Sequence, residues 1–348
     1  MDCVDALGSV PAWLRGLYPA GYLFLVHHTP WLWQACYRLL DTAPVYALIQ
    51  PLRRRWNLLM SRELRRRLAA RPFDAVLVTH FLPADVCNSL KRSGALSARL
   101  VVVVTDLHPH RLWLAPAADA FVVGIPQSAS VLLTRGVSER RVRVLGIPVG
   151  GSFCARHELA VLRQKFGLDA VRRTALVTSG GTTVGRFEET VRDLMGLERA
   201  HPGGLQLLVV CGDAEDSRRR VAAAAAGQPM PVRVYGFVEN MAEFMAVSDL
   251  VVAKAGGLTV SEALALGKPL LFYHIIPGQE ELNARYVAGH GAGVIAAGAG
   301  EAAAEVARCL EEPERLRRME QAAESLRRPN AAAEIMEEVV KPLLESVV

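Results

Sequence analysis

The chain has 348 residues, of which 51% are hydrophobic and 22% charged, and its formal net charge is +5. This composition excludes an intrinsically disordered chain, and the length suits two domains of ordinary size. No apolar run reaches the ~20 residues that cross a bilayer. The six cysteines are scattered without a C-x-x-C pair, which favours reduced thiols in a cytosolic protein.

Apolar runs alternate with helical patterns along the chain, which predicts an α/β architecture with parallel sheets. The first half opens with an aromatic-rich stretch, Trp13–Trp33, before any expected strand. The expected helices of this half are Val45–Ala70, Pro83–Arg92 and Gln127–Arg135. The expected strands are Ala75–Thr79, Leu100–Thr105, Ala120–Val123 and Val142–Leu145.

A cluster of Pro, Gly and Ser at Pro148–Arg156 indicates a domain boundary. The strands expected beyond it are Thr174–Thr178, Leu205–Cys211, Val232–Tyr235, Leu250–Ala253, Leu270–Tyr273 and Gly293–Ala296. The charged, alanine-rich tail from Glu301 onward is typical of helix. We therefore predict a first domain over residues 1–149, a second over 150–325 and a C-terminal helical segment over 326–348.

The helix expected at Val45–Ala70 carries an apolar stripe with basic residues around it. The stripe consists of Leu48, Leu52, Trp56, Leu59, Leu64 and Leu68. Two arginine clusters lie around it, one of Arg53, Arg54 and Arg55 and the other of Arg65–Arg67. One interpretation is a stripe that faces the core, with a solvated charged face. The other is a basic amphipathic helix that lies on an anionic lipid surface.

The segment Thr105–Trp113, TDLHPHRLW, follows an expected strand and concentrates titratable side chains. Asp106, His108 and His110 alternate, so an extended backbone would point all three to one side, where they could hold Zn²⁺. Nothing else in the chain supplies an obvious further ligand. We therefore expect no metal site.

Two glycine-containing turns of the second half follow expected strands. Ser179-Gly180-Gly181-Thr182 precedes a helical stretch, and backbone N–H groups of such a turn can contact phosphate. In Gly236-Phe237-Val238-Glu239-Asn240-Met241, Asn240 suits the first position of a helix, with Glu243 as partner in a capping box.

The most informative stretch runs from Ser248 to Asn283 and reads as strand, glycine turn, helix, strand, loop and helix. Two helix starts follow two strand ends, and that edge of an open α/β sheet favours phosphorylated ligands. Thr259 and Glu262 have the spacing of a capping box. Gln279, Glu280 and Asn283 place three polar side chains just after a Pro-Gly turn, with Gln279 and Asn283 on one helical face.

This stretch resembles the donor-nucleotide site of glycosyltransferase family 28, in the group of monogalactosyldiacylglycerol synthase and processive diacylglycerol glucosyltransferase. The first matching motif, K-x-G-G-L-T-x-S-E-A-L, consists of Lys254, Gly256, Gly257, Leu258, Thr259, Ser261, Glu262, Ala263 and Leu264. The second, P-G-Q-E-x-x-N, consists of Pro277, Gly278, Gln279, Glu280 and Asn283. The resemblance implies the GT-B fold: two Rossmann-like domains facing a cleft, with the last helix returning to the first domain.

The resemblance also implies residue roles on the donor side. Glu262 would accept hydrogen bonds from both ribose hydroxyls of UDP, in addition to any capping role. The donor sugar would contact Gln279, Glu280 and Asn283. The turn with Gly180 and Gly181 would lie near the pyrophosphate, and backbone groups at Phe237 and Val238 would bind uracil.

On the acceptor side, the segment Thr105–Trp113 is similar to a family motif that faces the cleft. Asp106 and His110 would be acceptor-site residues and the candidates for the general base, with Trp113 as an apolar wall. The stretch Trp13–Trp33 fits the membrane-touching region of the family. Trp56 and the arginines Arg53, Arg54 and Arg55 are the candidate lipid contacts.

The family pattern places a strand and a glycine-rich G-G-G-H loop before the point where this chain begins, and Met1–Asp5 resembles its second strand. We therefore expect an N-terminal domain that lacks its first strand and that loop. Either the start codon is assigned too late or the protein is a truncated relative, which puts the activity of the chain as given in doubt.

The expected function is transfer of galactose or glucose from a UDP-sugar to diacylglycerol or a related lipid. The alternatives are an N-acetylglucosamine transferase acting on a cell-wall lipid precursor and a non-catalytic truncated relative. The expected partners are the UDP-sugar, the lipid acceptor and an anionic membrane surface, and no nucleic acid. We expect a cytoplasmic protein on the inner face of the membrane, without a cofactor, because the UDP-sugar is a substrate.

Overall fold

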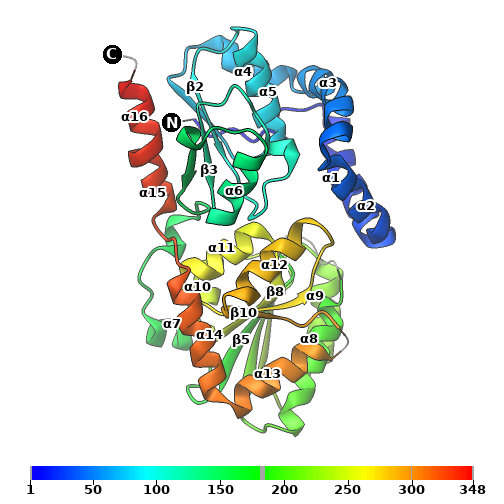
Figure 1. Cartoon of the computed structure of the whole chain (residues 1–348). Coiled ribbons are helices and arrows are strands. Elements are labelled where there is room, and N and C mark those ends of the chain that lie inside the picture. The colour runs from blue at the N-terminus through cyan, green and yellow to red at the C-terminus, as the bar shows by residue number, and fades with distance from the viewer. Residues whose placement is uncertain (1, 181–184, 299, 347–348) are drawn as a thin grey trace. The chain divides into compact units, whose positions relative to one another are not determined.

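The computed structural model describes residues 2–180, 185–298 and 300–346. The chain folds into two compact units, one formed by Met1–Pro148 with Asn330–Val348 and the other by Val149–Pro329 (Figure 1). Each unit contains a parallel β-sheet with helices around it, so the predicted α/β class is confirmed.

The sheet of unit 1 has four parallel strands in the order β1-β2-β3-β4. They are β1 (Ala75–Val78), β2 (Arg99–Val103), β3 (Ala120–Val123) and β4 (Val142–Val144). All four were expected from their apolar runs, because a parallel strand covered on both faces leaves little room for polar side chains. Residues 2–5 form no strand, which contradicts the expected likeness of Met1–Asp5 to a strand.

The helices before β1 depart from the prediction. The single helix expected at Val45–Ala70 is two helices with a break at Ser61. The helices of this part are α1 (Ala12–His28), α2 (Pro30–Leu40), α3 (Ala43–Met60) and α4 (Arg62–Ala70). Two further helices, α5 (Phe81–Arg92) and α6 (Pro126–Thr134), connect the strands of the sheet as expected.

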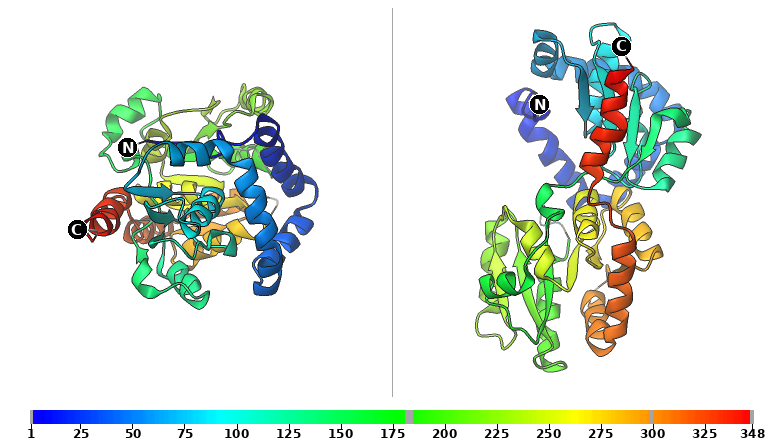
Figure 2. Two further views of the ribbon diagram at one scale, coloured as in Figure 1. Left: turned by 90° about the horizontal axis from the view of Figure 1, so that it is seen from above. Right: turned by 90° about the vertical axis from the view of Figure 1, so that its left-hand side faces the viewer.

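The last segment of the chain belongs to unit 1, from Asn330 onward. It consists of α15 (Ala331–Ile335), a π-helical turn (Met336–Val340) and α16 (Lys341–Glu345), and Figure 2 shows it beside the sheet of unit 1. The buried side chains of Ile335, Val339 and Val340 pack on those of Val101 and Val122. Apolar contact therefore holds this segment against one face of the sheet.

Unit 2 has six parallel strands in the order β10-β9-β8-β5-β6-β7. They are β5 (Arg173–Thr178), β6 (Leu205–Val210), β7 (Val232–Tyr235), β8 (Leu250–Lys254), β9 (Leu270–His274) and β10 (Gly293–Ile295). The helices are α7 (Leu159–Lys165), α8 (Phe187–Gly196), α9 (Glu215–Ala225), α10 (Met241–Val247), α11 (Gly257–Ala265), α12 (Gln279–Gly289), α13 (Glu301–Glu311) and α14 (Pro313–Ser325).

The strand order of unit 2 reverses between β5 and β8. The chain runs outward from β5 through β6 to β7, then crosses to the other side of β5 to form β8. Open α/β sheets bind ligands beyond the carboxyl ends of the strands at such a reversal. In this unit, those ends are followed by Ser179-Gly180 and by the glycine turn before α11.

Candidate functional site

Lys254 and Gly180 lie next to each other at the carboxyl edge of the second sheet. Gly180 has a left-handed backbone (φ +66°), and a Cβ there would lie 3.9 Å from Cε of Lys254. Lys254 is only 8% exposed. Burial lowers the pKa of this ammonium group, and the neighbouring Glu280 carboxylate acts in the opposite direction. The edge therefore holds a nearly buried cation beside a glycine turn, a combination suited to an anionic ligand.

Helix α11 begins at Gly257, with Gly256 at its N-cap, and no side chain caps it. The first N–H groups of a helix have no partner within the helix, so this end can donate to an anion. The Ser261 hydroxyl donates instead to the carbonyl of Gly257 at 2.8 Å, and the Leu258 side chain is exposed. The helix start and Lys254 thus adjoin the same edge of the sheet.

The predicted capping box at Thr259 and Glu262 does not form. Because α11 begins at Gly257, Thr259 is already its third residue and Glu262 lies a turn further along the helix. Within the described part of the chain, the half-buried Glu262 carboxylate has no hydrogen-bond or ion-pair partner. Burial raises its pKa to about 7. This carboxylate can therefore accept hydrogen bonds from a ligand.

Two of the three residues expected at the donor sugar have internal partners instead. The Asn283 side chain is fully buried, and its Nδ2 donates to the carbonyl of Ala255 at 2.8 Å. Glu280 is 8% exposed, and its Oε2 accepts the Ile276 N–H at 2.8 Å. Both side chains fix the loops that flank α11 and α12. The side chain of Gln279, like the whole of Gly181, lies outside the described residues.

The buried amide of Asn283 gives a stability test. In Asn283→Asp, a carboxylate oxygen faces the carbonyl of Ala255, so we expect a loss of about 3 kcal/mol or more in the free energy of unfolding at pH 8. The loss should shrink toward pH 5, because a protonated acid can donate to that carbonyl. Urea unfolding at both pH values measures it, with the exposed Asn330→Asp as control. Equal stability of the two variants would contradict the assignment.

The turn after β7 presents an aromatic side chain at the same sheet edge. Phe237 is 68% exposed and Val238 is half-buried. Asn240 lies at the N-cap of α10 but does not cap it, since its Nδ2 donates to Oε2 of Glu243 at 2.6 Å. Its predicted position is confirmed and its predicted capping bond is not.

His110 of unit 1 is 2% exposed, and both of its ring nitrogens are engaged. Nε2 lies 2.9 Å from the carbonyl of Tyr37 and therefore donates, while Nδ1 accepts the Leu112 N–H at 3.1 Å. Burial lowers the pKa of the ring. No free lone pair remains for a base. The prediction of His110 as a candidate base is corrected to a structural role, in which it anchors α2.

In the rest of the segment Thr105–Trp113, Trp113 lies in the hydrophobic core of unit 1 and Asp106 lies at the carboxyl edge of its sheet. Trp113 is 1% exposed within the hydrophobic core of unit 1, so it is not a cleft wall as expected. Its indole N–H donates to Oδ2 of Asp106 at 3.0 Å. Asp106 is half-buried after the carboxyl end of β2, and His108 lies 3.7 Å from Asp41. Among the described residues, no group of three or more His, Cys, Asp or Glu side chains could hold a metal ion.

His80 was not predicted and lies near Trp113, after the carboxyl end of β1. Its Nδ1 accepts the Leu82 N–H at 3.2 Å at the start of α5, and burial lowers the pKa of the ring. The sequence shows only a single His between a strand and a helix. That pattern by itself predicts a residue that caps the helix N-terminus and does not predict a functional role.

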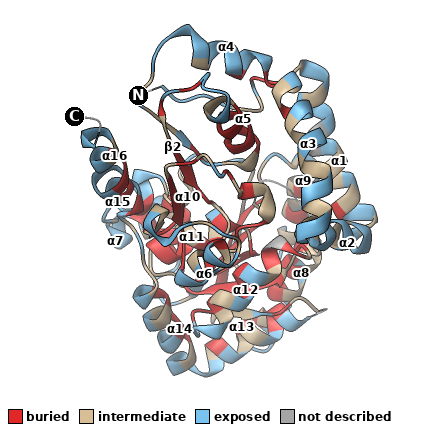
Figure 3. Cartoon of the chain, turned by 45° about the horizontal axis from the view of Figure 1, so that its top comes forward, coloured by how far each residue is buried: buried red, intermediate tan, exposed pale blue. Residues whose placement is uncertain are grey.

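The apolar stripe of the predicted basic helix is split by the structure. Its α3 part, the outer stripe, is exposed: Leu48 81%, Leu52 72%, Trp56 47% and Leu59 45%. Figure 3 colours most of α3 as exposed or intermediate. Leu64 is buried and Leu68 packs on the core, so the core-facing interpretation holds only for α4. Arg55 is exposed and Arg54 half-buried, but the Arg53 side chain is 16% exposed and faces Asp85, which corrects its assignment as a lipid contact.

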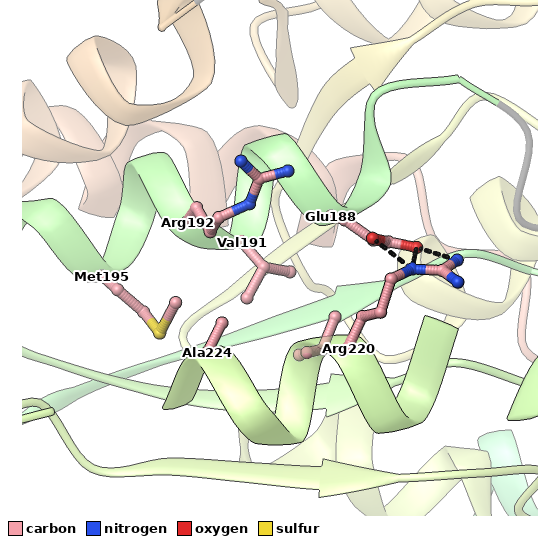
Figure 4. A pocket seen from close by; sticks show the side chains of 7 residues that line it. Glu188, Val191, Arg192, Met195, Arg220 and Ala224 are labelled. Atoms are coloured by element: carbon pink, nitrogen blue, oxygen red, sulfur yellow. Dashed lines mark hydrogen bonds and ion pairs between the residues drawn. The ribbon is translucent and has the colours of Figure 1, made fainter. Parts of the chain in front are cut away.

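A recess between α8 and α9 contains none of the predicted residues (Figure 4). Arg220 pairs with Glu188 there at 2.7 Å, and the apolar side chains that line the recess include Val191 and Met195.

No described helix is long and apolar enough to cross a membrane.

Two family models match consecutive parts of the chain. Residues 3–149 match monogalactosyldiacylglycerol (MGDG) synthase, and residues 174–338 match the glycosyltransferase family 28 C-terminal domain. The chain belongs to glycosyltransferase family 28. As a family 28 member, it is an enzyme of the class that transfers hexoses from UDP-sugars.

Curated relatives and solved structures agree with this family. A processive diacylglycerol beta-glucosyltransferase of Bacillus cereus (strain AH187) is 29% identical over 265 residues, 76% of this chain and 67% of that protein. One of Bacillus thuringiensis (strain Al Hakam) is 28% identical over 266 residues, with the same shares.

MurG of Acinetobacter baumannii superimposes with a TM-score of 0.61 at 17% identity, covering 82% of this chain and 78% of that one. The UDP-GlcNAc 2-epimerase of Neisseria meningitidis bound to UDP-GlcNAc gives 0.62 at 15% identity, covering 80% and 79%. At these identities the likeness shows the fold alone, and it confirms the expected GT-B fold.

Proposed function

We propose that this family 28 enzyme transfers glucose or galactose from a UDP-sugar to diacylglycerol or a related lipid at a membrane surface. The observation that carries the proposal is the edge between β5 and β8, where Lys254, the uncapped start of α11 and Glu262 occur together. The names of the curated relatives support the lipid acceptor.

On the donor side, the diphosphate of UDP lies at the start of α11, close to Lys254 and the turn at Gly180 and Gly181. Glu262 accepts hydrogen bonds from the ribose hydroxyls, and backbone groups at Phe237 and Val238 bind uracil. Gln279 is kept as the candidate for direct contact with the sugar, since Oε2 of Glu280 accepts the Ile276 N–H and Nδ2 of Asn283 donates to the Ala255 carbonyl. The helix start and Lys254 stabilise the negative charge that develops on the leaving UDP.

On the acceptor side, Asp106 takes the proton from the attacking hydroxyl. It is the half-buried carboxylate at the end of β2, and the Trp113 N–H fixes one of its oxygens. His110 is excluded from this role by its two hydrogen bonds. We keep the expectation that catalysis needs no metal or cofactor, and a chelator should leave turnover unchanged.

The membrane contact is made by the outer stripe of α3. Large apolar side chains at four positions of one helix face are exposed, and the exposed Arg55 lies beside them on the helix. This arrangement suits a helix lying in the headgroup region of an anionic leaflet, where each arginine contributes about 1 kcal/mol. The protein is then a peripheral protein on the cytoplasmic face.

The experiment is a transfer assay with UDP-glucose, UDP-galactose and UDP-N-acetylglucosamine, each offered diacylglycerol in one set of vesicles and a polyprenyl-linked cell-wall precursor in another. We expect glycosylated diacylglycerol from one of the two hexose donors. Transfer only from UDP-N-acetylglucosamine to a polyprenyl-linked cell-wall precursor would overturn the acceptor assignment. No product from any combination would contradict the proposal.

Glu262 gives the proposed donor site a distinct pH dependence. Its pKa of about 7 means that the free protein loses the ionised carboxylate as the pH falls below 7, and only the ionised form accepts from both ribose hydroxyls. UDP affinity should therefore fall by up to about tenfold per pH unit below 7. Glu262→Gln should weaken UDP binding at pH 8 and remove this part of the dependence.

Calorimetric titration between pH 6 and 8 measures this effect, and the Gln variant corrects for titration of the UDP phosphate itself. Because burial raises the Glu262 pKa above its unfolded value, ionisation destabilises the free fold as pH rises. Glu262→Gln should thus also raise the melting temperature above pH 7. Parallel pH profiles of the two proteins would refute the ribose assignment.

A further inference from the structure

Helix α3 presents its two faces in the reverse of the usual order. The outer stripe is exposed, whereas Arg53 and Asn57 of α3, and Ser61 at the break that follows the helix, face inward. The exposed fractions of Asn57 and Ser61 are 8% and 0%. A surface helix of a globular protein normally buries its apolar stripe, so some contact must hold α3 in the opposite rotation.

The partner of the inward face is Asp85 of α5, which is 1% exposed. Its Oδ2 accepts the Nδ2–H of Asn57 at 2.7 Å, and its Oδ1 lies 3.6 Å from a terminal nitrogen of Arg53. That same nitrogen of Arg53 lies 3.5 Å from the Tyr46 hydroxyl, seven residues and about two turns earlier on α3. One buried carboxylate therefore contacts two successive turns of the inverted helix.

Helix α5 is a fixed support for Asp85. Its side chains Ala84 and Cys87 are buried in the core of unit 1 with Leu100 of β2. Oδ1 of Asn88 accepts the Ala117 N–H at 2.9 Å, which ties α5 to the loop before β3. The position of Asp85 is thus set by the core and not by α3.

Two rotations of α3 about its axis compete. Turning the outer stripe inward would remove apolar surface from water, which the hydrophobic effect favours. It would also leave Asp85 buried without its partners, and an unpaired buried charge is strongly unfavourable. We infer that Asp85 is a positioning residue that fixes the rotation of α3 and so keeps the outer stripe available to lipid; the lipid part of this inference rests on the proposed function.

The test uses the full chain in three forms besides the parent. Asp85→Leu removes the carboxylate and completes an apolar surface for the stripe. Glu63→Leu, at an exposed carboxylate of α4 that pairs with Arg67, makes the same change in charge. Leu48→Ser/Leu52→Ser removes half of the outer stripe.

Three quantities are measured. Acrylamide quenching of Trp56 in buffer, taken as the difference from the same protein carrying Trp56→Phe, reports exposure of the stripe without lipid. Flotation with vesicles of equal parts phosphatidylcholine and phosphatidylglycerol reports lipid binding. Calorimetric UDP affinity reports whether unit 2 is intact.

In Asp85→Leu, Trp56 quenching should fall at least twofold and vesicle partitioning about tenfold, because binding scales with the apolar area presented. UDP affinity should not change. Losing an acidic residue would by itself strengthen binding to an anionic vesicle, so the expected direction is opposite to a plain charge effect. Glu63→Leu should match the parent in quenching and float equally well or better.

Unchanged Trp56 quenching in Asp85→Leu would overturn the inference. If that variant does not fold, Asp85→Asn replaces it, and unchanged quenching there has the same meaning. Reduced quenching in either variant supports the positioning role. If Leu48→Ser/Leu52→Ser floats like the parent while quenching falls in the Asp85 variant, the membrane contact fails and the positioning role stands.

Discussion

Lys254→Met should reduce turnover by about 10²- to 10³-fold, the range seen when one preorganised charge stabiliser is removed from an active site. Lys254 is 8% exposed at the carboxyl end of β8, beside the turn at Gly180. Charges interact more strongly there than in water, because the surroundings have a lower dielectric constant. The charge on the diphosphate increases as its bond to the sugar breaks, so kcat should fall more than UDP affinity.

The matched control is Lys268→Met. Lys268 is half-buried and precedes β9 at the opposite, amino-terminal edge of the sheet. Its replacement should leave kcat within about twofold of the parent, since an ion so placed cannot reach the leaving group. Full turnover in Lys254→Met, measured at saturating donor and acceptor, would show that the leaving diphosphate is stabilised elsewhere.

Asp106→Asn should lower kcat by about 10²- to 10⁴-fold, the usual effect of losing a general base. The amide oxygen can still accept the indole N–H of Trp113, so the fold should persist. UDP affinity should stay unchanged, because the donor edge belongs to the other unit. Single-turnover rates with diacylglycerol vesicles measure the effect on chemistry alone.

His110→Gln distinguishes the two candidate bases. A glutamine can still donate to the Tyr37 carbonyl, so this variant should lose less than about tenfold in rate, and any loss should accompany a lower melting temperature. If His110→Gln lost as much rate as Asp106→Asn at unchanged stability, the assignment of the base would have to be reversed. An active Asp106→Asn would instead direct attention to His80.

The strands were predictable because parallel strands buried on both faces are near-continuous apolar runs. The rotation of α3 was not, because Leu48, Leu52, Trp56 and Leu59 give the same helical period whether they face a core or a lipid surface. The break at Ser61 was also not predictable, because no glycine or proline marks it in the sequence. Pro51, the proline inside α3, does not end that helix.

At the candidate site, too, the sequence predicted some features and not others. Motif spacing predicted a helix after the glycine turn and placed Glu262 in it, but α11 begins at Gly257, before the capping box predicted at Thr259. It could not show that Asn283 points inward to Ala255, or that Trp113 is a core residue, since a motif names a position but not the direction of its side chain. Lys254 was recognised as part of the motif, yet its role emerges only from the strand order, which places it beside Gly180.

The most direct test of the donor site at the β5–β8 edge is calorimetric titration of UDP into the parent protein, Glu262→Gln and Lys254→Met at pH 8. The account predicts one UDP per chain for the parent and a weaker affinity in both variants. It also predicts that uridine, which lacks the diphosphate, loses affinity in Glu262→Gln but not in Lys254→Met. UDP binding of equal strength in all three proteins would contradict the account.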